Sequence, residues 1–202
     1  MVDVPIHIQG AVIRAAADVR HFQVVLVGLE KDTKGKITRV VARVYLSETG
    51  GWGDLILTPL PPMRHMHRAP TLVYMKPSVL SGESLCWLVA RTFVQIIEFD
   101  LERQSLAVTA VPVDHWRNHQ FSVMRENEGG LGFLFLSDFS AQLWMRKTGC
   151  DGVALWVLGR TIVLDKLLSL NLPEERTPLK IRGFAEENNV VFLMTALGVF
   201  MI

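Results

Sequence analysis

The chain has 202 residues, of which half are hydrophobic and a fifth are charged, with 21 basic and 20 acidic side chains. So apolar a composition excludes a disordered chain, and a net charge of +1 gives no electrostatic reason to expect nucleic acid or an anionic membrane as a partner. Only two cysteines, Cys86 and Cys150, and no N-x-Ser/Thr acceptor are present, which indicates a reducing intracellular compartment, cytoplasmic or nuclear.

Residues 1–21 give no single prediction. Ile6 and Ile8 alternate, and the AVIRAAA run at 11–17 fits either a short helix or the edge strand of an incomplete unit. A hairpin then follows, with strands at 22–29 and 37–46 around a charged turn, and Arg39 and Arg43 on its more solvated face. A short strand at 54–57 closes this first unit.

Residues 58–78 contain five of the nine prolines and are predicted as a loop between blades, with one added strand at 71–75. The loop carries His65 and His67, a spacing that allows two imidazoles on one metal ion. No Cys, Asp or Glu stands nearby to complete a tetrahedral set, so a solvated basic loop is favoured over a metal site.

The central unit is a three-strand meander. Three apolar runs, at 85–90, 93–99 and 106–111, are separated by polar segments of which 100–105 is the clearest turn. After a loop at 112–120, the third unit has strands at 121–125, 131–136, 141–145 and 154–158, then one helical turn within 164–170. The last unit has strands at 180–185, 190–194 and 198–202. The apolar run of 13 residues from 190 to the end is too short to span a membrane, which needs about 20 residues.

An aromatic residue recurs in the same place in each unit, just before a polar turn. These anchors lie 54, 45 and 56 residues apart, and are Tyr45, Phe99, Trp144 and Phe200. Their spacing is close to the 40 to 50 residues of propeller blades. A second aromatic column, Trp87, Phe133 and Phe192, stands in the strand before each anchor strand, and we expect its members to be buried together between neighbouring sheets. The pattern predicts an all-β fold, a partial β-propeller of about three and a half antiparallel blades over 22–202, open or incomplete.

No motif predicts catalysis, a cofactor or a metal site. Phosphate-binding loops, nucleophile elbows and zinc-binding helices are missing from the sequence. A glycosidase needs paired carboxylates in one cavity, whereas the acidic residues here fall almost wholly in predicted hairpin turns: Glu48, Asp100, Glu102, Glu126, Glu128, Glu186 and Glu187. The best candidate for a partner contact is the loop that combines an aromatic ring with several polar groups, with residues His115, Trp116, Arg117 and His119.

Several segments resemble the F-box-associated β-propeller region of a large family of plant, especially grass, F-box proteins. They are FQVVLVG, RVVARVY, SETGGWGDLI, EFDLERQSLAV, GGLGFLFLSDFSAQLW, DGVALWVLGRTIVLDKLLSL and IRGFAEENNVVFL, which together extend from about Phe22 to Ile202. The resemblance implies a non-catalytic substrate receptor of a cullin-type ubiquitin ligase, in which an N-terminal F-box docks to the ligase adaptor and the propeller holds a protein substrate.

No F-box precedes Phe22, and the last unit lacks the turn and third strand that follow in the central unit. We therefore expect a truncated member that does not bind the adaptor and has an unknown protein substrate. Self-association through its open blade edges is a further expectation. The alternatives are a propeller enzyme of glycosidase type and a gene fragment without function.

Overall fold

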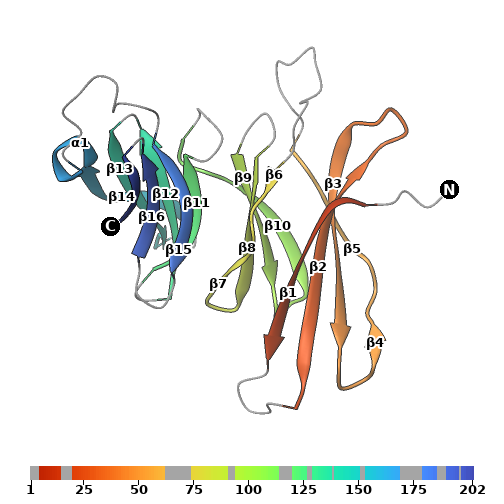
Figure 1. Cartoon of the computed structure of the whole chain (residues 1–202). Helices are drawn as coiled ribbons and strands as arrows, with labels where there is room; N and C mark the ends of the chain where they lie inside the picture. Colours follow the sequence, from red (N-terminus) through yellow and green to blue (C-terminus); the bar gives the residue numbers. More distant parts are fainter. Residues whose placement is uncertain are drawn as a thin grey trace. The chain divides into compact units, whose positions relative to one another are not determined.

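The computed structural model describes residues 5–14, 20–61, 74–90, 94–113, 120–126, 129–137, 139–150, 153–168, 179–185, 190–195 and 197–202. In this part of the chain it has 17 strands and one helix of four residues, so the predicted all-β class is confirmed (Figure 1). The chain divides into two compact units, Met1–Ala110 and Val111–Ile202, and each is built from two antiparallel sheets.

The first sheet of the first unit contains the strands that the sequence predicts most clearly. Its order is β1-β2-β3-β4 with β5 beside β3, for strands β1 (Ile6–Arg14), β2 (Phe22–Lys31), β3 (Ile37–Leu46), β4 (Gly51–Trp52) and β5 (Ile56–Pro59). The chain turns between β2 and β3 because the Asp32 carboxylate accepts the backbone N–H groups of Lys34 and Lys36, each at 2.9 Å. Both arginines predicted on the wet face of β3 are exposed.

The ambiguity at the N-terminus is resolved in favour of an edge strand. β1 runs antiparallel to β2, from Arg14 opposite Phe22 to Ile6 opposite Leu29, with an irregularity between Ile6 and Gln9. Residues 6–14 therefore belong to the first sheet.

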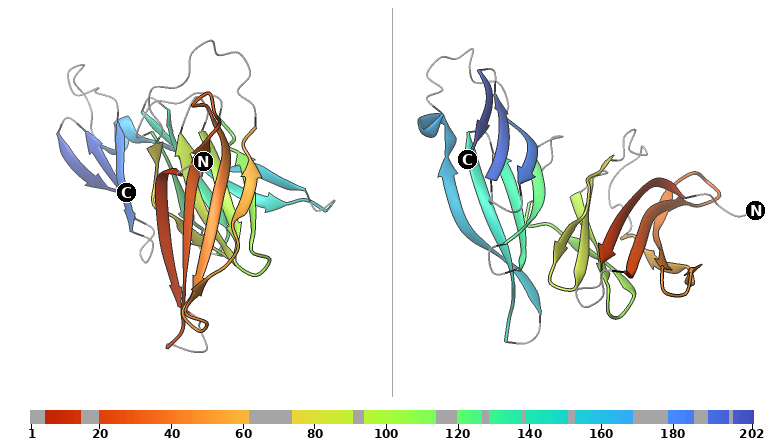
Figure 2. Two further views of the ribbon diagram at one scale, coloured as in Figure 1. Left: turned by 90° about the vertical axis from the view of Figure 1, so that its right-hand side faces the viewer. Right: turned by 60° about the horizontal axis from the view of Figure 1, so that its bottom comes forward.

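The second sheet of the first unit is the predicted meander. It contains β6 (Tyr74–Met75), β7 (Val79–Ser81), β8 (Ser84–Ala90), β9 (Val94–Asp100) and β10 (Ser105–Ala110), in the order β10-β9-β8-β6 with β7 beside β8. The turn between β9 and β10 is stabilised by the Asp100 side chain, which accepts the backbone N–H of Arg103 at 2.7 Å. Figure 2 shows the sheets from two further sides.

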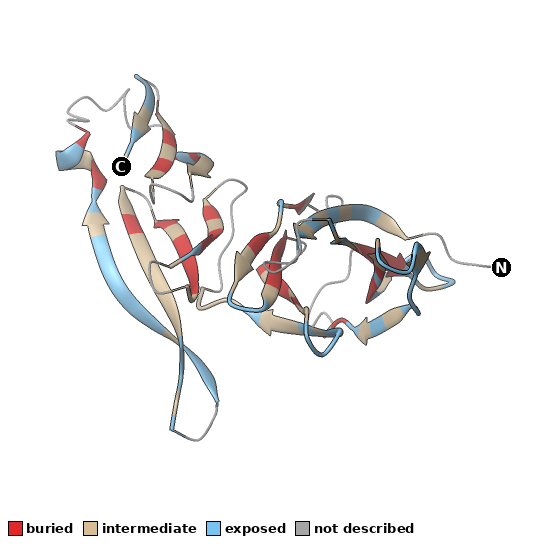
Figure 3. Ribbon diagram, turned by 90° about the horizontal axis from the view of Figure 1, so that it is seen from below, coloured by how far each residue is buried: buried red, intermediate tan, exposed pale blue. Residues whose placement is uncertain are grey.

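The two sheets of the first unit enclose one hydrophobic core. Alternate residues of β2 and β3 supply one side and alternate residues of β8 and β9 the other, because successive side chains of a strand point to opposite faces. Trp87 lies in this core with no exposed surface, beside Leu85, Ile97 and Phe99. Figure 3 shows the buried stretches of the strands in red. Its burial between neighbouring sheets is as predicted.

The second unit begins with a four-stranded sheet. Its order is β11-β12-β13-β14, for strands β11 (Phe121–Arg125), β12 (Leu131–Ser137), β13 (Ser140–Thr148) and β14 (Ala154–Val163). Helix α1 (Leu164–Leu167) follows, within the segment predicted as one helical turn. β13 extends past Trp144 to Thr148, so the strand predicted at 141–145 ends three residues too early. Arg146 and Lys147 still pair with β14, because the arms of this hairpin tolerate polar side chains on exposed faces.

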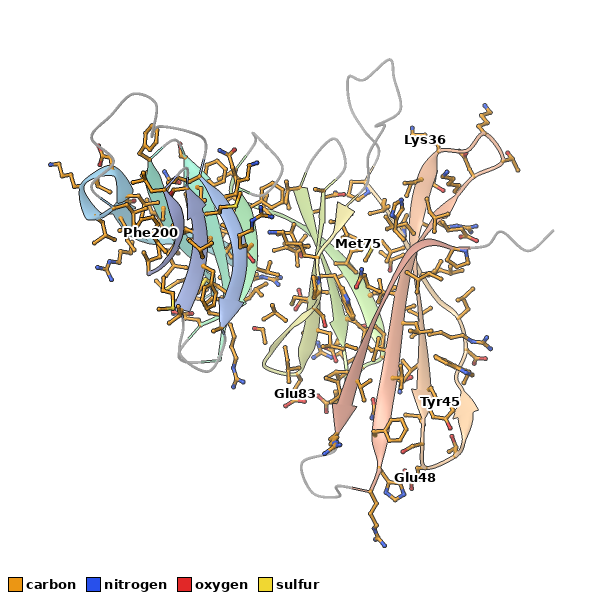
Figure 4. All side chains as sticks on the ribbon, in the orientation of Figure 1. Lys36, Tyr45, Glu48, Met75, Glu83 and Phe200 are labelled. Atoms are coloured by element: carbon orange, nitrogen blue, oxygen red, sulfur yellow. The ribbon has the colours of Figure 1, made fainter. Side chains whose placement is uncertain are left out.

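A three-stranded sheet completes the second unit. Its order is β15-β16-β17, for β15 (Lys180–Ala185), β16 (Val190–Thr195) and β17 (Gly198–Met201). The core between the two sheets includes Leu136, Leu164, Leu179 and Leu193, all without exposed surface. Phe200, labelled in Figure 4, packs against this core from β17.

The predicted aromatic column is correct in part. Phe133 is fully buried, against Trp156 at 6.0 Å between ring centroids, but it belongs to the second unit whereas Trp87 belongs to the first. Phe192 is only half-buried, because the face of β16 that meets the core carries Val191 and Leu193. The alignment of Phe192 with Trp87 is therefore wrong, since a slip of one residue moves a side chain to the opposite face.

Candidate interaction surface

The predicted contact loop lies outside the described residues. His115, Trp116, Arg117 and His119 all fall within 114–119, and the histidines of the proline-rich loop, His65 and His67, fall within 62–73. Both remain sequence-based predictions. Gln120, which directly follows the predicted contact loop, is described. Its carbonyl accepts a hydrogen bond from the backbone N–H of Leu136 in β12 at 2.6 Å.

The acidic residues that the structure describes are found mostly where the sequence predicts them. Glu48 and Glu102 are exposed in turns, Asp100 ends β9, and Glu126 directly follows β11, while Glu128, Glu186 and Glu187 lie outside the described residues. Over the described ranges, no three His, Cys, Asp or Glu side chains come together in a way that could hold a metal ion. Figure 4 shows Glu48 at a hairpin tip of the first unit.

Two described acidic residues lie within strands instead, the half-buried Glu98 of β9 and Glu30. Glu30 is buried on the inner strand β2, directly opposite Arg39 of β3. The Arg39 Nε atom lies 2.8 Å from the Glu30 Oε2 atom, at an angle that does not meet hydrogen-bond geometry. The pair is a cross-strand ion pair within one sheet, which is a structural role.

The cysteines and one lysine of the first unit are the other described groups with reactive or titratable side chains of note. Cys86 and Cys150 are both free thiols, the first buried and the second exposed. Burial lowers the pKa of the Lys76 ammonium group from 10.5 to about 8. Lys76 stands just after β6, and its backbone N–H donates to the carbonyl of Leu88 at 3.0 Å.

The second unit contains a groove of about 230 Å³ between its two sheets. Its wall is apolar and comes from the inner face of the four-stranded sheet and from the end of the three-stranded sheet, through residues Leu134, Leu143, Met145, Ile162, Val191 and Ile202. Leu143 and Met145 are only half-buried, although they continue the row that forms the core further along β13. The groove is therefore a part of the inter-sheet core that the three-stranded sheet leaves uncovered.

Charged side chains stand at the mouth of the groove. Arg125, Glu126 and Arg160 line it, and Glu126 is paired with Lys147, whose Nζ atom lies 3.6 Å from the Glu126 Oε1 atom. Arg160 is exposed and has no ion pair with any described residue. The mouth is thus positively charged, which makes it suited to a carboxylate.

Two edge strands border this groove. β14 is the last strand of its sheet, and five exposed apolar residues lie along it or next to it: Val153, Leu155, Val157, Leu158 and Val163. β17 is the last strand of the other sheet, where Val199 and Met201 are 61% and 70% exposed. Exposed apolar edges of this kind are where other strands pair.

Sequence reasoning missed this groove because its residues look like ordinary core positions. The one signal was composition, since β14 contains a single charged residue, Arg160, in ten.

No protein-family model, curated protein or solved structure matches this chain. Among the residues that the structure places, no helix is long and apolar enough to cross a membrane.

Proposed function

We propose that this chain is a non-catalytic protein-interaction module related to the F-box-associated β-propeller region of plant F-box proteins. In that family the propeller presents protein substrates to a cullin-type ubiquitin ligase. The observation that carries the proposal is the coincidence of the segments that resemble the family with the strands of successive antiparallel sheets. On this proposal the four sheets are blades of a partial propeller.

The chemistry of the described residues supports binding rather than turnover. A glycosidase would need two carboxylates facing one cavity, but the groove in the second unit has a single acidic residue, Glu126, and that residue is paired with Lys147. Apolar walls with a few charged groups at the mouth are typical of sites that bind a ligand or a peptide. On this proposal the partner is a protein that binds the loops and the open strand edges. A second copy of the chain competes for the same edges.

Two forms of the chain test the proposal, one as it stands and one with an F-box fused before residue 1. Each is immobilised and offered purified ligase adaptor together with a grass seedling extract. We expect the adaptor to be retained only by the fused form. The same few proteins should be captured by both forms and should bind again when purified.

A third measurement separates binding from catalysis. The purified chain is incubated with a panel of aryl glycosides, and no release of the aryl group above the buffer rate is expected. Adaptor binding by the chain alone, hydrolysis of a glycoside, or the failure of every captured protein to bind directly would each contradict the proposed function.

A further inference from the structure

The backbone of β17 presents hydrogen-bonding groups to an open edge. Val191 and Ile202 exchange two hydrogen bonds, from each N–H to the other carbonyl, at 2.9 and 3.1 Å. In an antiparallel ladder such pairs alternate with pairs whose N–H and C=O groups point away from each other. The outward pairs here include Val199 and Met201, so the free groups of these two residues face the side opposite β16, where the described chain has no strand.

A strand added at this edge would lie over the uncovered part of the core. β15 contacts β11, at one edge of the four-stranded sheet, and β17 is on the other side of β16. Continuing the three-stranded sheet past β17 therefore leads toward β14. Arg160 of β14 and Ile202 line the same groove, which shows that the two edges approach each other there.

The side chains of the added strand would alternate between two surroundings. A residue opposite Phe200 would point to the same side as Phe200, toward the core and the groove. Its neighbours, opposite Val199 and Met201, would point to the exposed face. The groove thus selects apolar residues at every second position and leaves the others free to be polar.

Charge decides which class of strand fits. The groove mouth offers Arg160 and Arg125, and neither forms an ion pair with a described residue. None of the described edge strands of this chain contains Asp or Glu, whereas β1, β11, β14 and β15 contain Arg or Lys. A second copy therefore has no edge that could bring a carboxylate to Arg160, and a partner with an acidic strand does.

We propose that β17 and the adjoining groove form a strand-docking site for an extended protein segment with apolar residues at alternate positions and an Asp or Glu facing Arg160. The site deepens the proposed function and rests on it, because it specifies how the module would hold part of its protein partner. Backbone hydrogen bonds to Val199 and Met201 supply affinity, and the groove and Arg160 supply selectivity.

A phage-displayed library of random ten-residue segments, panned against the immobilised full chain, tests the proposal. We expect enrichment of sequences with an acidic residue flanked two positions away by Val, Ile, Leu or Phe. The strongest segment is then made as a labelled peptide, and its affinity is measured by fluorescence polarisation. The absence of enrichment, or enrichment of basic or non-alternating sequences, overturns the proposal.

Variants then locate the site. Val199→Pro removes the outward N–H without touching the ladder to β16, and Pro is tolerated at edge positions of this kind. It should weaken peptide binding at least about tenfold, which corresponds to about 1.4 kcal/mol, whereas Val199→Ala keeps the N–H and should change the affinity less than about twofold. Circular dichroism and the thermal midpoint check that both variants fold. Unchanged binding by the proline variant overturns the assignment of the edge.

Charge reversal tests the groove independently. Arg160→Glu should weaken binding about tenfold and should recover it when Lys replaces the acidic residue of the peptide. Lys34→Glu, an equal charge change in an exposed turn of the first unit, is the matched control and should leave binding unchanged. Equal effects of the two variants overturn the role of Arg160.

The remaining outcomes separate this site from the proposed function. Light scattering could show that the native chain is a dimer and that the Val199→Pro variant is a monomer. If no peptide displaces the second copy from that dimer, the edge belongs to a second copy and the proposal is overturned. If proteins captured from the extract bind the purified chain but are insensitive to Val199→Pro and Arg160→Glu, the docking site is wrong and the interaction module stands.

Discussion

Replacement of Trp87 by alanine tests the core of the first unit and the environment of one buried polar atom. The indole ring is fully buried, and its Nε1–H group has no hydrogen-bond acceptor among the described residues. Two effects of the replacement therefore oppose each other. Loss of the ring removes apolar contacts and leaves a cavity, while loss of the N–H removes the cost of keeping an unsatisfied donor out of water.

The magnitudes predict an order of stabilities that size alone would not give. Truncating a buried aromatic residue costs about 3 to 5 kcal/mol, and a buried unsatisfied donor costs about 1 to 3 kcal/mol. Subtracting the centres of these two ranges, Trp87→Ala should cost about 2 kcal/mol. Phe99 lies in the same core but has no polar side-chain atom, so Phe99→Ala should cost about 3 to 5 kcal/mol. Trp87→Phe keeps most of the ring, loses the donor and should lie within about 1 kcal/mol of the native chain.

Urea unfolding followed by far-ultraviolet circular dichroism measures these differences without depending on tryptophan emission. With a denaturant slope of about 2 kcal/mol per molar, Trp87→Ala should lower the midpoint by about 1 M and Trp87→Phe by less than about 0.5 M. If Trp87→Phe costs as much as Trp87→Ala, the indole N–H is satisfied in solution and the reasoning is refuted. If Phe99→Ala is nearly neutral, the two sheets do not share the core described above.

Three further predictions concern single groups in the first unit. Burial lowers the pKa of Lys76 from 10.5 to about 8, so the unfolded chain binds more protons than the folded chain between these pH values. The free energy of unfolding should therefore rise by up to about 2 kcal/mol from pH 8 to pH 10. In urea titrations, Lys76→Met should abolish this rise. If the free energies of unfolding of the native chain and of Lys76→Met change equally between these pH values, the prediction is wrong. Gly82 has a φ of 55° and open space where a Cβ would stand, so Gly82→Ala should cost about 1 kcal/mol and Gly82→Asn less, because Asn tolerates this conformation better; equal thermal midpoints for the two variants would rule this out. Arg39→Met leaves the Glu30 carboxylate buried without its partner and should cost about 1 to 3 kcal/mol, much of which Glu30→Gln should restore in the double variant if the ion pair is the cause.

The strands could be predicted because their signals are local. β3, β11 and β15 begin and end at the predicted residues, since alternating apolar side chains and a polar turn on either side define them within ten residues. β1 was ambiguous because AVIR is followed by alanines, which favour helix, and only pairing with β2 decides its type. In β1, pairing with β2 therefore outweighs the intrinsic helix propensity of the segment.

The face of a strand and the surface between sheets are not local properties. Phe192 looks equivalent to Trp87 in the sequence, but Phe192 pairs with the residue after its anchor, Phe200, while Trp87 pairs two residues before its own, Phe99. Because directly paired residues point to the same face of a sheet, this difference in pairing decides whether the aromatic ring faces the core. The groove arises because the three-stranded sheet leaves part of the four-stranded one uncovered, which no residue in either sheet reveals by its type.

The distribution of charge over the strands limits how this chain can pair with itself. Self-association was expected at open edges, but β1, β11, β14 and β15 carry basic residues, which repel one another when like edges meet. Among the uncharged edges, β10 is partly covered, because the Thr58 hydroxyl donates to the Leu106 carbonyl at 2.9 Å, and β4, β5, β6 and β7 have four residues or fewer. β17 is equally short, but it adjoins the apolar groove of the second unit, and Val199 and Met201 point backbone groups away from β16. On the proposed docking site, self-pairing and partner binding would compete for this one edge, and the positive charge of Arg160 would favour the acidic partner.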